Sequence, residues 1–382
     1  MNVKNVFLFI ILFIVVRAHA QVDSTMTDSL LLLKIQQAMD QPQPPPQPQA
    51  RVGASANPNL SVIGDMRGLY RSHGAHNFDA VLHEVEFSFE SVVDPYARAD
   101  FFYSVGEDEK TGEFSSEIEE GYLTTLSLPA HLQLKAGRFK EALGRVNTIH
   151  THALPFIDVP DAYVNFFGEE GLKGDGLSLS WLLPNRAFFQ ELTFQATDVA
   201  ESPSFERSQK NNYLYLAHLK NFWDLTDNAT LELGITGING ENLSRKITNI
   251  FALDLTYKWK PVQFNTYKSV TFQNELYYSH ARLDSVTVNA LGYYSMLNVQ
   301  VGKRLFLLGR YDYSNSPTSR EFVQQSGSLT LGWYATEFQK IEIEAKNTTT
   351  NVALEENDDE KNFTQVLFRW IFVIGSHGAH AY

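Results

Sequence analysis

The feature that most constrains this chain is a period-two alternation of apolar and polar residues that runs from Asn57 to the C-terminus. In residues 97–105, for example, every odd-numbered position is apolar, whereas Arg98, Asp100 and Ser104 are polar. Successive side chains of a β-strand point to opposite faces, so this period predicts strands with one apolar and one polar face. The pattern predicts 16 such strands. They cover residues 60–70, 81–90, 97–105, 116–127, 131–139, 175–183, 187–198, 212–223, 229–238, 247–260, 269–282, 286–301, 304–314, 326–338, 339–349 and 362–374.

The connections between these strands alternate in length. Short turns such as 93–95 and 128–130 alternate with long polar loops such as 106–115 and 198–211. Short turns at one end, long loops at the other and an even strand count are typical of outer-membrane barrels. We therefore predict an all-β transmembrane antiparallel barrel over residues 57–382, surrounded by the lipid of the cell outer membrane. The alternative is a soluble protein of two stacked sheets, a class that seldom needs this many strands.

The composition agrees with a membrane barrel and excludes several other classes. Aromatic residues make up 13% of the chain although the mean hydropathy is only -0.23, so aromatic surface is abundant without long apolar runs. The net charge of -13 argues against a nucleic-acid partner, because phosphate backbones are bound by concentrated basic surface. The sequence contains no cysteine, which excludes disulfides, thiolate zinc sites and cysteine nucleophiles.

Three segments of different composition precede the barrel. Residues 1–20 combine a basic start, an apolar run and an Ala-x-Ala motif, which predicts a cleaved signal peptide. The apolar run is 11 residues long, too short to span a membrane. Residues 21–41 contain a Leu-rich stretch that predicts a short helix, either self-associating or a partly ordered leader without a partner. Residues 42–56 are a Pro- and Gln-rich linker, expected to be an extended spacer.

The polar face of the strands is expected to line the lumen of the barrel. Sixteen strands leave room for water, whereas eight would be filled by side chains. Charges of both signs on such a wall orient passing solutes, although a wet interior without selectivity is the alternative. Acidic side chains outnumber basic ones on this face, which predicts a weak preference for cations. The predicted lumen charges include Arg67, Glu84, Glu86, Arg98, Asp100, Glu117, Glu119 and Lys135.

The longest insertion in the alternation covers residues 140–173. Loops of more than a dozen residues without structure of their own are usually functional. This loop is rich in Phe, Ile, Val and Pro, which would not all face water. We predict that it folds into the lumen and narrows the pore. The predicted constriction residues are Arg138, Asn147, His150, His152, Phe156 and Asp158.

The long loop also carries the only His-x-His pair that we interpret as a metal site, His150 and His152. Imidazole is a common ligand of zinc and copper, and this spacing can direct two rings at one ion. Asp158 is the nearest acidic residue and the predicted third ligand of a weakly bound zinc ion. No other cofactor is expected. The alternative is that both rings form hydrogen bonds to loop carbonyls and fix the fold of the loop.

Several motifs occur in a distinctive order: 121–129, 135–139, Gly144, Asn147, His150, His152, 158–160, 174–176 and 375–380. In this order and spacing they resemble porin-like proteins called zinc-regulated TonB-dependent outer-membrane receptors, relatives of the phosphate-selective porin type. The resemblance implies a porin-like channel with a connection to zinc. Only residues 21–56 would precede the first strand in the mature chain, which leaves no room for a plug domain, so we expect passive diffusion instead of TonB-driven transport.

Together these patterns predict a passive outer-membrane channel for small solutes or metal ions, with zinc or a zinc chelate as the suggested solute. One alternative is a structural or adhesive barrel whose lumen is blocked by the aromatic side chains of the long loop. A second alternative is a barrel hydrolase, but no Gly-x-Ser-x-Gly motif occurs and we do not expect an enzyme. The porin resemblance and the Leu-rich stretch favour a homotrimer.

Overall fold

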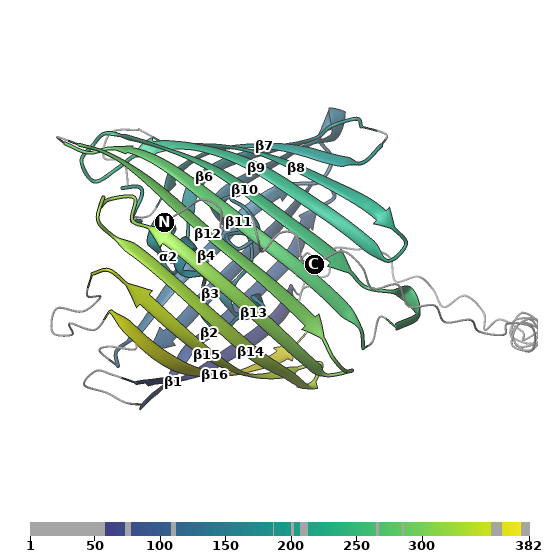
Figure 1. Ribbon diagram of the computed structural model, residues 1–382. Coiled ribbons are helices and arrows are strands. Elements are labelled where there is room, and N and C mark those ends of the chain that lie inside the picture. Colours follow the sequence, from purple (N-terminus) through teal and green to yellow (C-terminus); the bar gives the residue numbers. More distant parts are fainter. Residues whose placement is uncertain are drawn as a thin grey trace, which may run out of the picture. The chain divides into compact units, whose positions relative to one another are not determined.

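The computed structural model describes residues 58–72, 78–107, 112–185, 187–199, 202–206, 213–264, 267–284, 286–352 and 361–375. The expected signal peptide, short helix and linker lie outside these residues. The described chain forms one closed barrel of 16 antiparallel strands, in which each strand pairs with its neighbours in sequence (Figure 1). Pairing of the first strand with the last closes the sheet. The predicted transmembrane antiparallel barrel is confirmed.

The strands are long enough to cross a membrane. A strand of 13 residues, such as β10, is about 43 Å long, and at the usual tilt of ~45° it rises about 30 Å, the thickness of a hydrocarbon core. The strands are β1 (Asn59–Arg71), β2 (Phe78–Asp94), β3 (Ala97–Glu107), β4 (Phe114–Thr125), β5 (Leu132–Lys140), β6 (Lys173–Leu182), β7 (Phe189–Val199), β8 (Leu214–Thr226), β9 (Ala229–Glu241), β10 (Ile247–Trp259), β11 (Ser269–Arg282), β12 (Thr287–Gln300), β13 (Leu305–Asn315), β14 (Val323–Thr336), β15 (Gln339–Thr350) and β16 (Asn362–Gly375).

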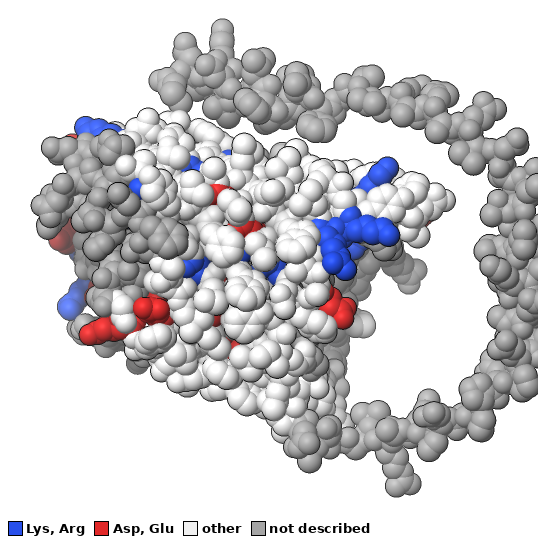
Figure 2. All heavy atoms as spheres, turned by 90° about the horizontal axis from the view of Figure 1, so that it is seen from below, with Lys and Arg blue, Asp and Glu red and all other residues white. Residues whose placement is uncertain are grey.

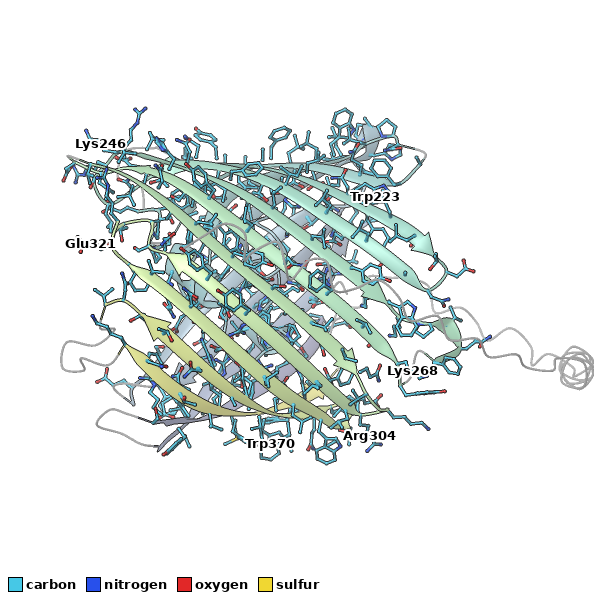
Figure 3. The ribbon with its side chains drawn as sticks, viewed as in Figure 1. Trp223, Lys246, Lys268, Arg304, Glu321 and Trp370 are labelled. Carbon is cyan, nitrogen blue, oxygen red and sulfur yellow. The ribbon has the colours of Figure 1, made fainter. Side chains whose placement is uncertain are left out.

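The two ends of the barrel differ in their connections, as the sequence predicts. One end carries short connections, such as residues 95–96 and 227–228, and we call it the turn end. The other end, the loop end, carries the longer connections, including residues 141–172 between β5 and β6. Lys268 and Arg304 belong to the turn end (Figure 3).

The outward face of the barrel is apolar, and charged side chains gather mainly toward its two ends (Figure 2). Every tryptophan lies near the turn-end limit of its strand. Aromatic side chains concentrate at membrane–water interfaces, which accounts for this placement; Trp223 and Trp370 are labelled in Figure 3. The tryptophans are Trp181, Trp223, Trp259, Trp333 and Trp370.

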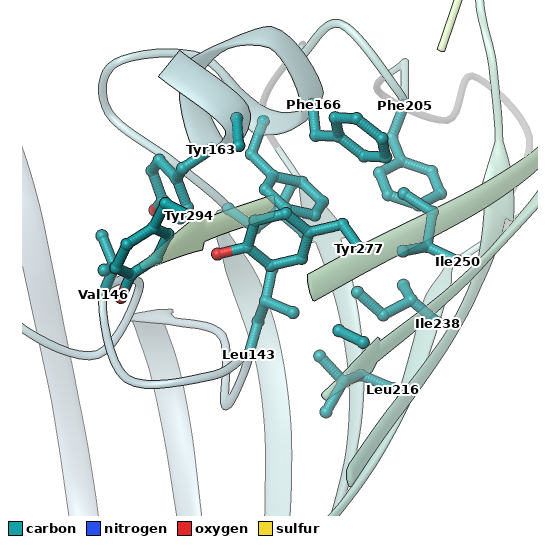
Figure 4. Close-up of a cluster of buried hydrophobic side chains, with 14 of the residues drawn as sticks. Leu143, Val146, Tyr163, Phe166, Phe205, Leu216, Ile238, Ile250, Tyr277 and Tyr294 are labelled. Carbon is teal, nitrogen blue, oxygen red and sulfur yellow. The ribbon is translucent and has the colours of Figure 1, made fainter. Parts of the chain in front are cut away.

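The segment 141–172, called the inner loop below, packs inside the barrel (Figure 4). It contains the 3-10 helix η4 (Thr151–Ala153) and the α-helix α2 (Asp161–Phe167). Two further 3-10 helices, η3 (Pro129–His131) and η5 (Val262–Phe264), lie in turn-end connections. Among the described residues, no helix is long and apolar enough to cross a membrane.

Candidate functional site

The apolar side chains of the inner loop pack on one side of the lumen wall. Phe166 and Phe167 lie against Tyr277 of β11, with ring centroids 5.7 and 5.2 Å apart, and Phe156 lies 6.4 Å from the ring of Tyr294 (Figure 4). All five rings are buried. We call this contact the apolar bed, and its wall residues include Leu216, Ile238, Ile250, Ala252, Tyr277, Tyr294 and Met296. The lumen face of β8 to β12 is therefore less polar than the alternation alone predicts, because the loop covers it.

A buried carboxylate fixes the first turn of the inner loop to this wall. Glu275 of β11 accepts hydrogen bonds from the backbone N–H groups of Arg145 and Val146, at 3.1 and 2.9 Å. The hydroxyls of Tyr277 and Tyr294 also donate to it, at 2.6 and 2.8 Å. Gly144 precedes these residues with φ +55°, and a Cβ there would collide with the Glu275 carboxylate. The close approach therefore requires glycine.

Asn147 braces the inner loop and does not line a pore. Its amide donates to the carbonyls of Glu141 and Leu172, at 2.7 and 2.9 Å, and its oxygen accepts from the N–H of Leu172 at 2.8 Å. The hydroxyl of Tyr163 donates to the same oxygen at 2.5 Å. These bonds join the two ends of the loop, so Asn147 sets the width of its neck.

The middle of the inner loop is held by oppositely charged groups, which we call the aspartate anchor. Asp158 accepts from Arg310 of β13 at 2.8 Å and from Lys346 of β15 at 2.5 Å. Asp161 accepts from Lys346 at 2.6 Å and from Ser326 at 2.5 Å. Burial alone would raise the pKa of Asp158, but Arg310 and Lys346 outweigh it and hold that pKa well below its usual range. The expected third zinc ligand is therefore committed to a salt-bridge network.

The aspartate anchor also orders the neighbouring aromatic and backbone groups. The Arg310 guanidinium lies 5.0 Å from the centre of the Phe156 ring and donates to the carbonyl of Asp158 at 2.8 Å. Arg369 of β16 donates to the carbonyls of Thr151 and Leu154, at 3.3 and 3.0 Å. Phe156 was predicted to narrow a pore, but it is enclosed between the loop and the wall.

Across the lumen from the apolar bed, His150 is held by carboxylates of β2 and β4, a contact we call the histidine anchor. Its Nδ1 donates to Glu86 at 2.6 Å, and its Nε2 donates to Glu120 at 2.8 Å. The ring of Phe102 lies against it, with centroids 4.7 Å apart. Burial by itself lowers the pKa of His150, but the two carboxylates outweigh it and raise the pKa to about 10. The imidazole is therefore a cation at neutral pH.

A β-bulge supplies the extra carboxylate at this anchor. In the pairing of β3 with β4, Phe102 faces Glu120 and Tyr103 faces Ile118, so Glu119 has no partner in the register. A bulge re-aims side chains, and both Glu119 and Glu120 turn toward His150. Strict alternation predicts only one of these two neighbours on the lumen side. Two consecutive acidic residues in an alternating strand were the available signal for the bulge.

His152 lies beside His150, with ring centroids 5.7 Å apart. Its Nδ1 is 3.6 Å from Glu86, and Thr151 between the two histidines donates to Glu84 at 3.0 Å. The predicted proximity of the two rings is thus present in the structure. Glu86 and Glu119 take the place in which Asp158 was expected.

Arg138 is a further predicted constriction residue that does not line the lumen. Arg138 forms an ion pair with Asp175 at 2.9 Å across the β5–β6 ladder. Asp175 shares its strand face with Leu177 and Leu179, which are exposed on the outer wall. Arg138 therefore faces away from the lumen. The reason is strand alternation, which places Lys135 and Arg138, three residues apart, on opposite faces.

The predicted lumen charges are engaged in local pairs. Arg67 binds Asp65 at 2.8 Å, and Arg98 binds Glu90 and Asp100, each at 2.7 Å. The Lys135 ammonium lies 4.0 Å from the centre of the Tyr122 ring, and Glu117 pairs with Lys173. Glu120, Glu275 and Asp161 were not among the site residues predicted from the sequence. Glu275 carries no motif, and its role follows only from the loop backbone that reaches it.

Comparisons with known proteins agree with this architecture. The anion-selective porin from Comamonas acidovorans has a TM-score of 0.57 at 9% identity, covering 82% of this chain and 98% of the porin. OprB of Pseudomonas putida has a TM-score of 0.54 at 9% identity, covering 83% and 94%. A loop-deletion mutant of OmpT, an outer membrane protein of Vibrio cholerae, has a TM-score of 0.55 at 7% identity, covering 83% and 98%.

Comparison of sequences identifies one distant relative and no family. An uncharacterized protein of Aquifex aeolicus (strain VF5) is 25% identical over 359 residues, which cover 83% of this chain and 75% of that protein. No family model matches the chain. The structural relatives support the porin-like part of the expected resemblance and give no support to a TonB-dependent receptor. The chain has the fold of the outer-membrane porins and is a barrel of the cell outer membrane.

Proposed function

We propose that the protein is a passive diffusion channel for small hydrophilic solutes, metal cations among them, and that the inner loop narrows its pore. The observation that carries the proposal is that one loop inside a barrel of 16 strands is bound to β4 on one side of the ring and to β11 on the nearly opposite side. A loop bound in this way reduces the cross-section open to solutes without closing the ends of the barrel. Charged groups on the wall favour passage of hydrated solutes over apolar ones.

Partly exposed charges support a wet passage on the turn-end side of the inner loop. The side chains of Arg98 and Lys220 are 43% and 36% exposed. Their acidic partners, Glu90 and Glu232, remain partly accessible as well. Mixed charges at an aqueous wall are inexpensive to solvate and act on passing ions.

The outer wall supports assembly into a homotrimer. The Arg138–Asp175 pair faces outward, and Asp175 lies seven residues from Leu182 at the turn end of β6. Seven residues rise about 16 Å at a tilt of ~45°, which is inside the ~25 Å apolar band of such barrels. Charges facing lipid at that depth are costly, so we propose that neighbouring copies cover this face. One of the Vibrio cholerae OmpT structures is described as a trimer form.

A blocked barrel is the second candidate, favoured by the completeness of loop packing. Phe156, Phe166 and Phe167 are all buried, and the inner loop binds wall groups from β2 to β16. Single-channel recording of the refolded full chain in planar bilayers separates the two functions. Stepwise, ohmic conductance in the wild-type protein supports the channel. Absence of steps in correctly folded protein supports the blocked barrel.

A further inference from the structure

Glu119 of β4 lies close to the His150 ring but accepts no hydrogen bond from it. The side chain of Glu119 is 8% exposed, and among the described residues it forms no hydrogen bond. Its nearest cationic atoms are Nδ1 of His150 at 3.9 Å and Nζ of Lys140 at 4.0 Å, both beyond hydrogen-bonding distance. A buried carboxylate without a donor is costly and calls for a ligand.

The atoms around Glu119 have the composition of a transition-metal site. Ligand atoms of Glu86, Glu119 and His150 all lie within 4.8 Å of one another, and all three residues are buried. His152 adds a second imidazole, with its Nδ1 3.6 Å from the same Glu86 oxygen. Imidazole nitrogens with carboxylate oxygens suit zinc and its first-row neighbours, whereas magnesium and calcium prefer oxygen ligands alone.

The separations suit one ion with small adjustments. Two ligands on metal bonds of 2.0–2.2 Å at a tetrahedral angle stand about 3.4 Å apart. The Glu86–His150, Glu86–His152 and Glu119–His150 separations are 2.6, 3.6 and 3.9 Å, which bracket that value. The ion would take the position of the proton that His150 Nδ1 now shares with Glu86.

The outer groups are arranged as metal sites require. Metal-bound histidines usually donate their second ring N–H to a carboxylate, which fixes the orientation of the ring. Here the Nε2 of His150 donates to Glu120 at 2.8 Å, which leaves Nδ1 directed at Glu86 and Glu119. The Phe102 ring against His150 further limits its rotation.

We propose that Glu86, Glu119 and His150, with His152 as a fourth ligand, bind one divalent transition-metal ion of the zinc type, and that Glu120 orients His150. The site joins the inner loop to β2 and β4, so the bound ion fastens the loop to the wall. It does not depend on whether the barrel conducts solutes.

The test is zinc binding to the purified full-length protein, measured by isothermal titration calorimetry with Zn²⁺ alone as the probe. We expect one ion per chain. Glu119→Gln should weaken binding at least ~10-fold, because it removes a ligand that makes no hydrogen bond to the protein. Glu120→Gln should weaken zinc binding less than Glu119→Gln, because the amide oxygen of Gln can still accept a hydrogen bond from Nε2 of His150.

A control variant and a competition experiment complete the test. His280→Gln is the matched control, because His280 lies on the exposed outer face beside Asn289 and should leave the affinity unchanged. Excess Mg²⁺ should not displace zinc. Unchanged one-to-one zinc binding in Glu119→Gln, or equal competition by Mg²⁺, overturns the proposal, as does absence of zinc binding by the wild-type protein with its barrel intact by circular dichroism.

Discussion

The two anchors of the inner loop use opposite charge arrangements. At the aspartate anchor, the loop supplies anions and the wall supplies Arg310 and Lys346. At the histidine anchor, the loop supplies the cation, His150, and the wall supplies Glu86 and Glu120. At the first anchor, Arg310 and Lys346 hold the pKa of Asp158 well below its usual range. At the second anchor the positive charge is carried by an imidazole, whose shared proton a metal ion could replace, so only the second anchor could respond to the metal content of the medium.

Removing the anions of the aspartate anchor should have the largest effect. In Asp158→Asn with Asp161→Asn, Arg310 and Lys346 lose their loop partners inside the barrel, and breaking a buried ion pair costs about 3–5 kcal/mol. We expect the loop to detach while the 16-strand ladder persists, which limited proteolysis followed by mass spectrometry would detect as cleavage within 141–172.

Asp284→Asn is the control for that experiment, because Asp284 is exposed at the loop end. It should leave the protease pattern of the wild-type protein unchanged. A double variant that resists cleavage as well as this control would mean that the apolar bed alone docks the loop.

Breaking the histidine anchor should have a smaller effect. His150→Gln removes the cation, but Glu86 and Glu120 can then take up protons, so we expect docking of the loop to weaken by about 1–3 kcal/mol. Hydrogen exchange of the backbone amides in 145–155 should report faster opening. If the amides of His150→Gln exchange as fast as those of the aspartate double variant, the predicted difference between the two anchors is wrong.

The sequence predicted the barrel well because strand alternation is a local signal. Trp181 and Leu179 face outward whatever the position of the inner loop, because alternation along β6 alone decides which side chains point outward. The loop also entered the lumen as expected, because its Phe and Ile side chains needed burial. The contacts between loop and wall were harder to predict, because their partners are more than a hundred residues apart in the chain. Examples are the contact of Val146 with Glu275 and that of Asp158 with Arg310. The bulge at Glu119 likewise depends on pairing with β3, which no single strand reveals.

The smallest effect concerns pH at the neck of the inner loop. Burial raises the pKa of Glu141 to about 8, and the Thr197 hydroxyl and Lys135 offset only part of this. The folded protein therefore binds this proton more tightly than the unfolded chain, whose Glu pKa is 4.5. The resulting stability is complete below about pH 4.5 and is lost as the pH rises through about 8. Hydrogen exchange of residues near 147 should quicken between pH 7 and 9, after correction for the intrinsic rate.

Glu141→Gln sharpens this prediction, because its side chain is neutral at every pH. The variant should show no such loosening, whereas amides beside Asp158 should stay equally protected in both proteins. Identical pH profiles for the wild-type protein and the variant would assign the change to another group.

The central claim is that the inner loop sets the width of the channel. Lys140 and Lys173 are directly paired across β5 and β6, so residues 141–172 can be replaced by a two-residue Asn-Gly turn without stretching the barrel. The decisive measurement is single-channel conductance of this shortened protein and of the wild-type protein in the same salt. The account predicts a several-fold higher conductance after the replacement. Equal conductance in the two proteins would contradict it.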